Sequence, residues 1–437
     1  MRLANDTTYW RSVQLHKRDL ADIVSTMILL RPTLLVAGLL LSSCAVLVQP
    51  RSGPDLAASA AQTAATIDAR RTSALSKGLR DKALIFDTRV RENFMSTSGL
   101  VGRLPGSSGD LEITSHYMAA MALKAIATQD AAGHVGAHRA LNGLHALEAD
   151  SGHPGYLPRY LGSQSPAHAN SYTQLYFGLM MAHRYCPELR REISALSDRI
   201  ARHLLANDLR LLDPTTGEMD EYSDLQPRRV EMSRSRVMDC LVFLETAKYL
   251  SVDKDIQREL RIWLARAFAF DYPYRLQTSH LQLPGLKLPT HASDWLNMLR
   301  LYTLVQVGEN PDYQRALNRL YASQNREHNA LFAAMMGDYD QAELSLAGFP
   351  LELDNREMMN SPLPDVPEKW FPSFVKTRLI REAREPMPVY RRPLSHNEWK
   401  RNPYRLDGNI GEMGDLHYSG LDYLLAYWLV KAERRDK

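Results

Sequence analysis

The chain has 437 residues, of which 45% are hydrophobic, 24% charged and 8% aromatic. This composition excludes a disordered chain, a collagen and a multispanning membrane protein, and it indicates a protein that buries a core. Lys and Arg number 53 against 50 Asp and Glu, a net charge of +3, and no long basic run occurs. Nucleic acid is therefore not an expected partner, because phosphate recognition needs clustered positive charge. The length fits two or three average domains or one large domain.

The most specific feature of the N-terminal region is an apolar stretch, 34–41, that follows Arg31 and ends in Ser42, Ser43 and Cys44. The stretch is shorter than the roughly 20 residues that a bilayer-spanning helix requires. This segment resembles a bacterial lipoprotein signal. The resemblance implies that a diacylglycerol is attached to the thiol of Cys44 and that cleavage leaves Cys44 as the acylated first residue.

The first 26 residues fit a signal poorly, because their three aspartates oppose the usual orientation of a signal peptide. We therefore expect the true start at Met27 and a signal peptide that extends to residue 43. The resemblance implies a lipid-anchored protein of the bacterial cell envelope, held through acylated Cys44 at the periplasmic face of the outer membrane. The alternatives are an uncleaved anchor and a hydrophobic core strand that ends in Ser-Ser-Cys.

Residues 44–77 are rich in Ala, Ser and Thr and hold few large apolar side chains. Such a segment buries too little surface to offset its ordering entropy, so we predict a lipidated flexible tether. Two further cysteines follow it, Cys186 and Cys240. The predicted compartment permits a disulfide between them, but both lie in helical apolar patterns, which favour two buried free thiols.

Apolar residues recur at spacings of three and four from Gly78 to about Leu346, whereas strand-like alternation is scarce. This pattern predicts an all-α fold of antiparallel helical hairpins with long irregular loops. The predicted helices are 79–95, 112–128, 134–149, 168–184, 188–207, 232–250, 253–270, 292–307, 311–324 and, last, 416–432.

The predicted helices are joined by short and long connections. Short ones are 186–188 and 251–253, while 150–166, 211–231 and 272–291 are longer and carry Gly, Pro, aromatic and charged residues. Long joints on one side of a hairpin array are where binding sites are usually built. The Pro-rich segment of about 347–414 is too long for a simple connection, so we expect it to wrap the helical body and cover one mouth of it.

Five segments beyond residue 100 carry a family resemblance: Ser108–Tyr117, Arg199–Gly217, His291–Asp294, Trp399–Gly408 and Asp422–Trp428. They are similar to a group of largely uncharacterised bacterial proteins that look related to six-hairpin glycosidase-like (α/α) toroids. The resemblance implies one (α/α) toroid domain over 78–437. The group often has adjacent acidic residues after paired serines, whereas here Thr114-Ser115 precede His116-Tyr117.

A glycosidase of this architecture needs two carboxyl groups, one that donates a proton and one that activates water or attacks. The candidates are Asp110 and Glu112 at a helix start, Glu221 in the acidic joint 213–224, and Asp294 in the first turn of another helix. Ordinary structural roles compete with this interpretation. Asp110 is also a typical helix cap, the acidic joint is also typical of a solvated turn, and Asp294 also fits a first-turn acid.

Aromatic and basic residues near these carboxylates are the candidate substrate-binding residues, because aromatic faces stack on sugar rings and arginine binds hydroxyls or carboxylates. They are Tyr156, Arg159, Tyr160, Tyr222, His291 and Trp295. If a sugar site exists, the segments 110–112, 153–160, 218–224 and 291–294 should line one concavity. The packed tyrosines of an ordinary helix connection are the competing interpretation for 153–160.

We expect no cofactor and no metal. His134, His138 and His145 share a helical face, but the chain has no HExxH and no CxxC motif, and a surface histidine stripe needs no metal. The acidic joint 213–224 lacks the residues of a calcium loop.

The sequence leaves three functions open. The first is an enzyme on envelope polysaccharide, a glycoside hydrolase or a related lyase or epimerase. The second is a non-catalytic helical scaffold lipoprotein that binds a protein or a glycan. The third is a peptidoglycan-associated hydrolase or regulator.

Overall fold

The structure is a computed structural model, and it describes residues 78–102, 110–163, 167–219, 223–229, 234–276, 282–283, 286–287, 291–324, 327–349, 351, 368–372, 379–383, 386, 388–389, 392, 403 and 419–435. The chain divides into a unit Met1–Ala61, outside these residues, and a unit Gln62–Lys437, which holds every element named below. The predicted signal peptide, Cys44 and the tether lie outside the described residues, as does most of the Pro-rich segment. None of the described helices is both long and apolar enough to cross a membrane.

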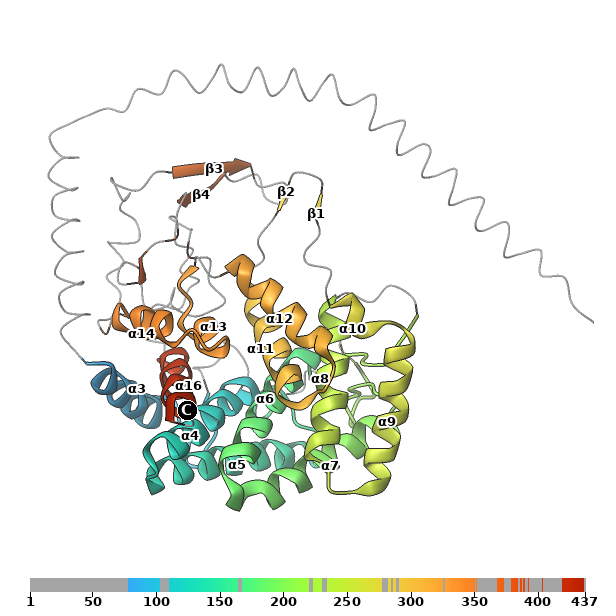
Figure 1. Cartoon of the computed structure of the whole chain (residues 1–437). Coiled ribbons are helices and arrows are strands. Elements are labelled where there is room, and N and C mark those ends of the chain that lie inside the picture. The colour runs from blue at the N-terminus through green and yellow to red at the C-terminus, as the bar shows by residue number, and fades with distance from the viewer. Residues whose placement is uncertain are drawn as a thin grey trace, which may run out of the picture. The chain divides into compact units, whose positions relative to one another are not determined.

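The described part of the chain is helical, which confirms the all-α prediction (Figure 1). Its helices are α3 (Leu79–Asn93), α4 (Asp110–Thr128), α5 (Ala131–Ser151), α6 (Ala169–Tyr185), the 3-10 turn η1 (Pro187–Leu189), α7 (Arg190–Ala206), α8 (Arg234–Leu250), α9 (Lys254–Ala269), α10 (Tyr272–Arg275), α11 (His291–Val307), α12 (Pro311–Gln324), α13 (Ala330–Met335), α14 (Tyr339–Ala347) and α16 (Leu421–Arg435). Two short antiparallel pairs complete them, β1 (Gln282–Leu283) with β2 (Leu286–Lys287) and β3 (Glu368–Pro372) with β4 (Leu379–Ala383).

The helices divide into an inner and an outer set, according to how apolar they are around their circumference. In α4 every residue from Leu111 to Ala125 is buried, and α6, α8 and α16 are buried almost as completely. In contrast, α7 and α9 bury a single stripe, such as Ile193, Leu196 and Ile200 of α7. A helix that is apolar all round requires neighbours on every side, whereas an amphipathic one covers the surface.

The inner helices α4, α6, α8, α11 and α16 are neighbours, and the outer helices pack on them. Side chains near the beginning of one inner helix contact those near the beginning of the next: Glu112 of α4 meets Ser171 of α6, and Thr173 of α6 meets Asp239 of α8. Their ends also meet, since Arg435 of α16 donates to the Ile126 carbonyl of α4. The inner helices therefore run in the same direction.

Two outer helices show the same alignment. His134 and His138 of α5 pair with Glu188 and Glu192, and His145 contacts Arg199, so three contacts in a row join residues 54 positions apart. A constant separation means that α5 and the η1–α7 segment lie side by side and point the same way. Consecutive helical hairpins therefore repeat one orientation.

The first and last described helices meet. The hydroxyl of Tyr423 in α16 donates to the carbonyl of Leu79 in α3 at 2.9 Å, and Figure 1 shows α16 beside both α3 and α4. A buried lysine adds to this contact, because Lys82 Nζ donates to the carbonyls of Ala347 (2.7 Å) and Phe349 (2.8 Å) at the end of α14. Burial lowers the pKa of Lys82 to about 8.

The predicted helices match the observed ones to within a few residues, with three additions. The short helices α10, α13 and α14 carry 4, 6 and 9 residues, too few for a clear apolar period. Cys186 and Cys240 are both buried and free, which confirms the favoured interpretation of the two thiols. The long joints precede α6, α8 and α11, so they lie at the end where these helices begin.

The closest approach of two inner helices predicts a stability effect. A Cβ on Gly178 of α6 would lie 2.5 Å from the backbone oxygen of Ser115 in α4, which cannot move without the helix. We expect Gly178→Ala to lower the free energy of unfolding by about 1–3 kcal/mol, measured by urea denaturation.

Gly136→Ala is the comparison variant. The three atoms nearest its new methyl group all belong to the side chain of Met121 and none to backbone. Because a side chain can rotate and alanine has the better helix propensity, this variant should lose less stability than Gly178→Ala. Equal losses in the two variants would contradict close packing of α4 on α6.

Candidate functional site

The N-terminal ends of four inner helices bring a set of polar side chains together inside the body. We call this set the inner polar cluster, and its members are Glu112 and His116 of α4, Ser171 and Thr173 of α6, Asp239 of α8, Asn297 and Arg300 of α11, and Arg159 of the joint before α6. All are buried except Arg159, which is half-buried. Buried charges are rare unless they are paired, so each member needs a partner.

Glu112 is held by two donors from different elements. Its Oε1 accepts from Ser171 Oγ at 2.6 Å and from Arg159 Nε at 3.1 Å. Its Oε2 is buried and has no hydrogen-bond partner among the described residues. Glu112 therefore keeps one oxygen with hydrogen-bonding capacity, and the donors on the other oxygen fix its orientation.

Asp239 is more completely paired. Arg300 donates to it twice, from Nε to Oδ1 and from Nη2 to Oδ2, each at 2.7 Å, and Thr173 Oγ1 adds a third bond of 2.5 Å. Arg300 also donates to Asn297 Oδ1 at 2.9 Å. The side chains of Asp239 and Arg300 are only 6% and 3% exposed. This bidentate pair joins α8 to α11, and α6 contributes through Thr173.

His116 lies one turn after Glu112 on the same face of α4, because residues four apart share a helix face. Its ring meets the rings of Trp295 (centroids 5.7 Å apart) and Phe177 (6.1 Å) edge-on. Burial lowers its pKa to about 3, so the imidazole is neutral, and its Nε2 has no hydrogen-bond partner among the described residues. Glu112 and His116 thus each hold one buried polar atom without a hydrogen-bond partner among the described residues.

Asp294 and Trp295 lie in the first turns of α11, and the ring of Trp295 faces His116. Asp294 is buried. Burial lowers the pKa of Arg234 at the start of α8, and the negative charge of Asp294 partly offsets that shift. Trp295 is half-buried against the core.

Asp110 stands at the first position of α4, where its Oδ2 accepts from the Leu161 amide at 3.3 Å. Burial raises the pKa of this carboxyl, the amide of Leu161 opposes that effect, and the nearby charge of Glu112 raises the pKa further. A carboxyl with a raised pKa is suited to donate a proton. The segments 110–112 and 159–161 therefore meet.

The remaining predicted residues have different positions. Tyr160 is half-buried beside Arg159, whose guanidinium carbon lies 5.3 Å from the ring centroid. Tyr156 is buried under the same joint, where its hydroxyl accepts from the Ala167 amide, and it lines a separate polar pocket of about 220 Å³ with Asp150 and Asp213. Glu221 and Tyr222 lie outside the described residues. His291 begins α11, but its side chain is also outside them.

Sequence reasoning missed the members of the cluster that lie deepest. Asp239 and Arg300 occur inside apolar runs, Val-Met-Asp-Cys-Leu and Met-Leu-Arg-Leu-Tyr. A charge within a segment that is apolar on all faces must be buried and paired, and this signal could have identified both residues. Ser171 and Thr173 carry no comparable signal, because serine and threonine are common in helices as ordinary surface residues.

The cluster combines a neutral imidazole beside the ring of Trp295 with a carboxylate that a half-buried arginine and a serine hold in place. Among the described residues, the cluster contains no three His, Cys, Asp or Glu side chains whose ligand atoms are close enough to share a metal ion.

Comparisons with protein-family models, with curated proteins and with solved structures find no match to this chain. The family resemblance of the five segments therefore stays a prediction.

The buried pair predicts a large stability effect. Removal of the Arg300 charge in Arg300→Met leaves the carboxylate of Asp239 buried and uncompensated, so the free energy of unfolding should fall by about 3–5 kcal/mol. Arg258→Met, which breaks the exposed pair with Asp255, is the matched control and should cost less than about 1 kcal/mol. Urea denaturation of both variants measures the difference. Similar costs would show that the buried pair is not required for stability.

His116 predicts a pH dependence of stability. Its pKa is about 3 in the folded chain against 6.5 for an unperturbed histidine, so between these values the unfolded chain binds a proton that the folded chain does not. The free energy of unfolding should therefore fall as the pH decreases from about 6.5 to about 3, with a slope of up to about 1.4 kcal/mol per pH unit from this residue. In His116→Gln the slope should be shallower by that amount. His138→Gln, at a mostly exposed site, should keep the parental slope.

Proposed function

We propose that the helical body is a closed (α/α) toroid that acts on a polysaccharide of the bacterial envelope, as a glycoside hydrolase or a related lyase or epimerase. In this proposal the protein is anchored to the membrane through acylated Cys44. The proposal has three parts, namely the toroid, the site and the anchor, and different observations support the first two. The anchor depends on the resemblance of 27–44 to a lipoprotein signal.

The alternation of the helices supports the toroid. Each of the outer helices α3, α5, α7, α9, α12 and α14 precedes a more buried helix. These are the inner helices α4, α6, α8, α11 and α16 and the short helix α13, whose residues are all buried. The contacts between α4, α6, α8 and α16 align these inner helices in one direction, and α16 returns to α3 and α4. A row of six such hairpins whose last member meets the first is the arrangement that a six-hairpin toroid requires.

One observation carries the proposal for the site: Glu112 Oε2 and His116 Nε2 are buried polar atoms on one face of α4, without a hydrogen-bond partner among the described residues. An unsatisfied buried group of this kind costs about 1–3 kcal/mol, and functional sites are where proteins tolerate such a cost. The hydroxyl groups of a sugar can supply both partners, and its ring can stack on Trp295 or Tyr160.

The chemical roles follow from the environment of each carboxyl. Asp110, whose pKa is raised, is the proposed proton donor to the leaving oxygen. Glu112 is positioned by Arg159 and Ser171 and is the proposed partner carboxylate. Asp294, which is buried on α11, is a further candidate for that role.

A specific observation also favours a second candidate, a non-catalytic glycan-binding protein. Arginine pairs with both Glu112 and Asp239, and a carboxylate engaged in an ion pair can orient a ligand without transferring a proton.

Digestion of a panel of envelope glycans with the purified full chain tests the proposal. We expect turnover of at least one glycan, and Asp110→Asn and Glu112→Gln should lower its rate by roughly 100-fold or more, because loss of a general acid or base typically costs that much. The matched control is Glu259→Gln, an exposed carboxylate of α9, which should retain the full rate.

A parallel binding measurement separates the two candidate functions. Binding without turnover, weakened when Glu112 or His116 is substituted, would identify the non-catalytic protein. Neither binding nor turnover of any glycan in the panel would contradict both.

A further inference from the structure

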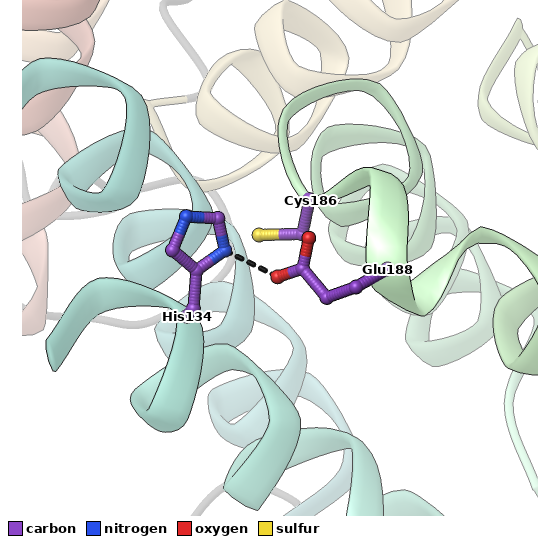
Figure 2. A group of neighbouring side chains, drawn as sticks. All are labelled: His134, Cys186 and Glu188. Carbon is purple, nitrogen blue, oxygen red and sulfur yellow. Dashed lines mark hydrogen bonds and ion pairs between the residues drawn. The ribbon is translucent and has the colours of Figure 1, made fainter. Parts of the chain in front are cut away.

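A second group of side chains, on the outer helices, has a different chemistry. Figure 2 shows His134, Cys186 and Glu188 pointing toward one another. His134 lies in the first turns of α5, Cys186 ends α6, and Glu188 lies in the turn η1. The expected stripe of His134, His138 and His145 is therefore not one site. His134 joins a thiol and a carboxylate that lie more than 50 positions further along the chain.

We propose that His134, Cys186 and Glu188 bind one divalent transition-metal ion of the zinc type. Their donor atoms, one ring nitrogen, one sulfur and one carboxylate oxygen, all lie within 4.8 Å of one another. Zinc bonds to sulfur at about 2.3 Å and to nitrogen or oxygen at about 2.0–2.2 Å, so a single ion can reach three donors after small side-chain rotations.

The donor set selects the type of ion. Thiolate and imidazole are ligands of zinc and related transition metals, whereas magnesium and calcium prefer oxygen donors alone. The three residues supply one sulfur, one imidazole nitrogen and one carboxylate oxygen. Burial raises the pKa of the Cys186 thiol to about 12, so the ion must displace the thiol proton when it binds. The three ligands leave the fourth tetrahedral position to water, an arrangement that accepts an exchangeable ligand.

The surroundings permit an ion to enter. The sulfur of Cys186 is buried at the base of the group, whereas the side chains of His134 and Glu188 are 38% and 49% exposed. His134 Nδ1 and Glu188 already contact each other, which fixes two of the three ligands beside the thiol. The turn is constrained because Pro187 lies between Cys186 and Glu188. Preformed donors of this kind reduce the ordering cost of binding.

A neighbouring pair shows what the same helices do without a thiol. His138 faces Glu192 one turn further along, at 4.0 Å, and His145 also contacts Glu192. These contacts are ordinary histidine–carboxylate pairs between α5 and α7. The presence of Cys186 distinguishes the first pair, and His138 provides a matched control for His134.

Titration of the reduced full chain with Co²⁺, a spectroscopic substitute for zinc, tests the proposal. We expect uptake of one equivalent with a thiolate-to-cobalt charge-transfer band, and displacement of the cobalt by Zn²⁺. Cys186→Ser should abolish the band, whereas Cys44→Ser and Cys240→Ser should retain it. Cys240 is the internal control, since it is also a buried free thiol.

The other two ligands are tested by affinity. His134→Gln and Glu188→Gln should each weaken cobalt binding by roughly 100-fold or more, because loss of a direct ligand should cost at least as much as loss of a residue that only hydrogen-bonds to a ligand. His138→Gln should leave cobalt binding unchanged. Circular dichroism of each variant without metal checks that the fold is intact. No charge-transfer band in the parent protein, or a band that survives Cys186→Ser, would overturn the proposal. An equal loss of affinity in His138→Gln would also overturn it, because the ion would then be bound by the histidine stripe.

Discussion

The buried ion pair of Asp239 and Arg300 is the interaction around which the helical body is organised. Two charges at this depth are tolerated only when they are paired and hydrogen-bonded. Here both carboxylate oxygens accept from the guanidinium, and Thr173 adds a third bond. The pair fixes the rotation of α8 and α11 about their own axes, because neither charge can turn away without losing its partner. It also fixes how far α8 and α11 are shifted along their axes relative to each other. The bond from Thr173 adds α6 to the same arrangement.

The pair also positions the candidate site. Thr173 is two residues beyond Ser171, which donates to Glu112, so α6 transmits the alignment of α8 and α11 to the first turn of α4. Gly178 allows α6 to approach the backbone of α4 at Ser115, which lies between Glu112 and His116 in the sequence. The cluster is thus held by parts of the core that have no chemical role, and Glu112 and His116 are the members with spare hydrogen-bonding capacity.

The inner and outer helices carry different sets of interacting polar side chains. The inner ones carry paired charges and aromatic rings at their N-terminal ends, beneath the long joints. The outer helix α5 and the η1–α7 segment are joined by three histidine contacts at a constant separation of 54 residues, two to carboxylates and one to Arg199. Cys186 joins the first of these contacts. The helices therefore carry two separate groups of polar side chains. The inner polar cluster is enclosed by the inner helices, and the group of His134, Cys186 and Glu188 lies where α5 meets the end of α6 and the turn η1.

The sequence by itself determined the class of the fold, because helical spacing of apolar residues is a local property and survives without knowledge of the partners. It also determined which joints are long. It pointed to Asp110, Glu112 and Arg159, which lie close together, and to Trp295, whose ring contacts His116. Only the tertiary structure decided the pairing of Asp239 with Arg300 and the meeting of His134 with Cys186. Both contacts join residues more than 50 positions apart, and whether two such side chains meet depends on the rotation and height of whole helices, which no local pattern contains.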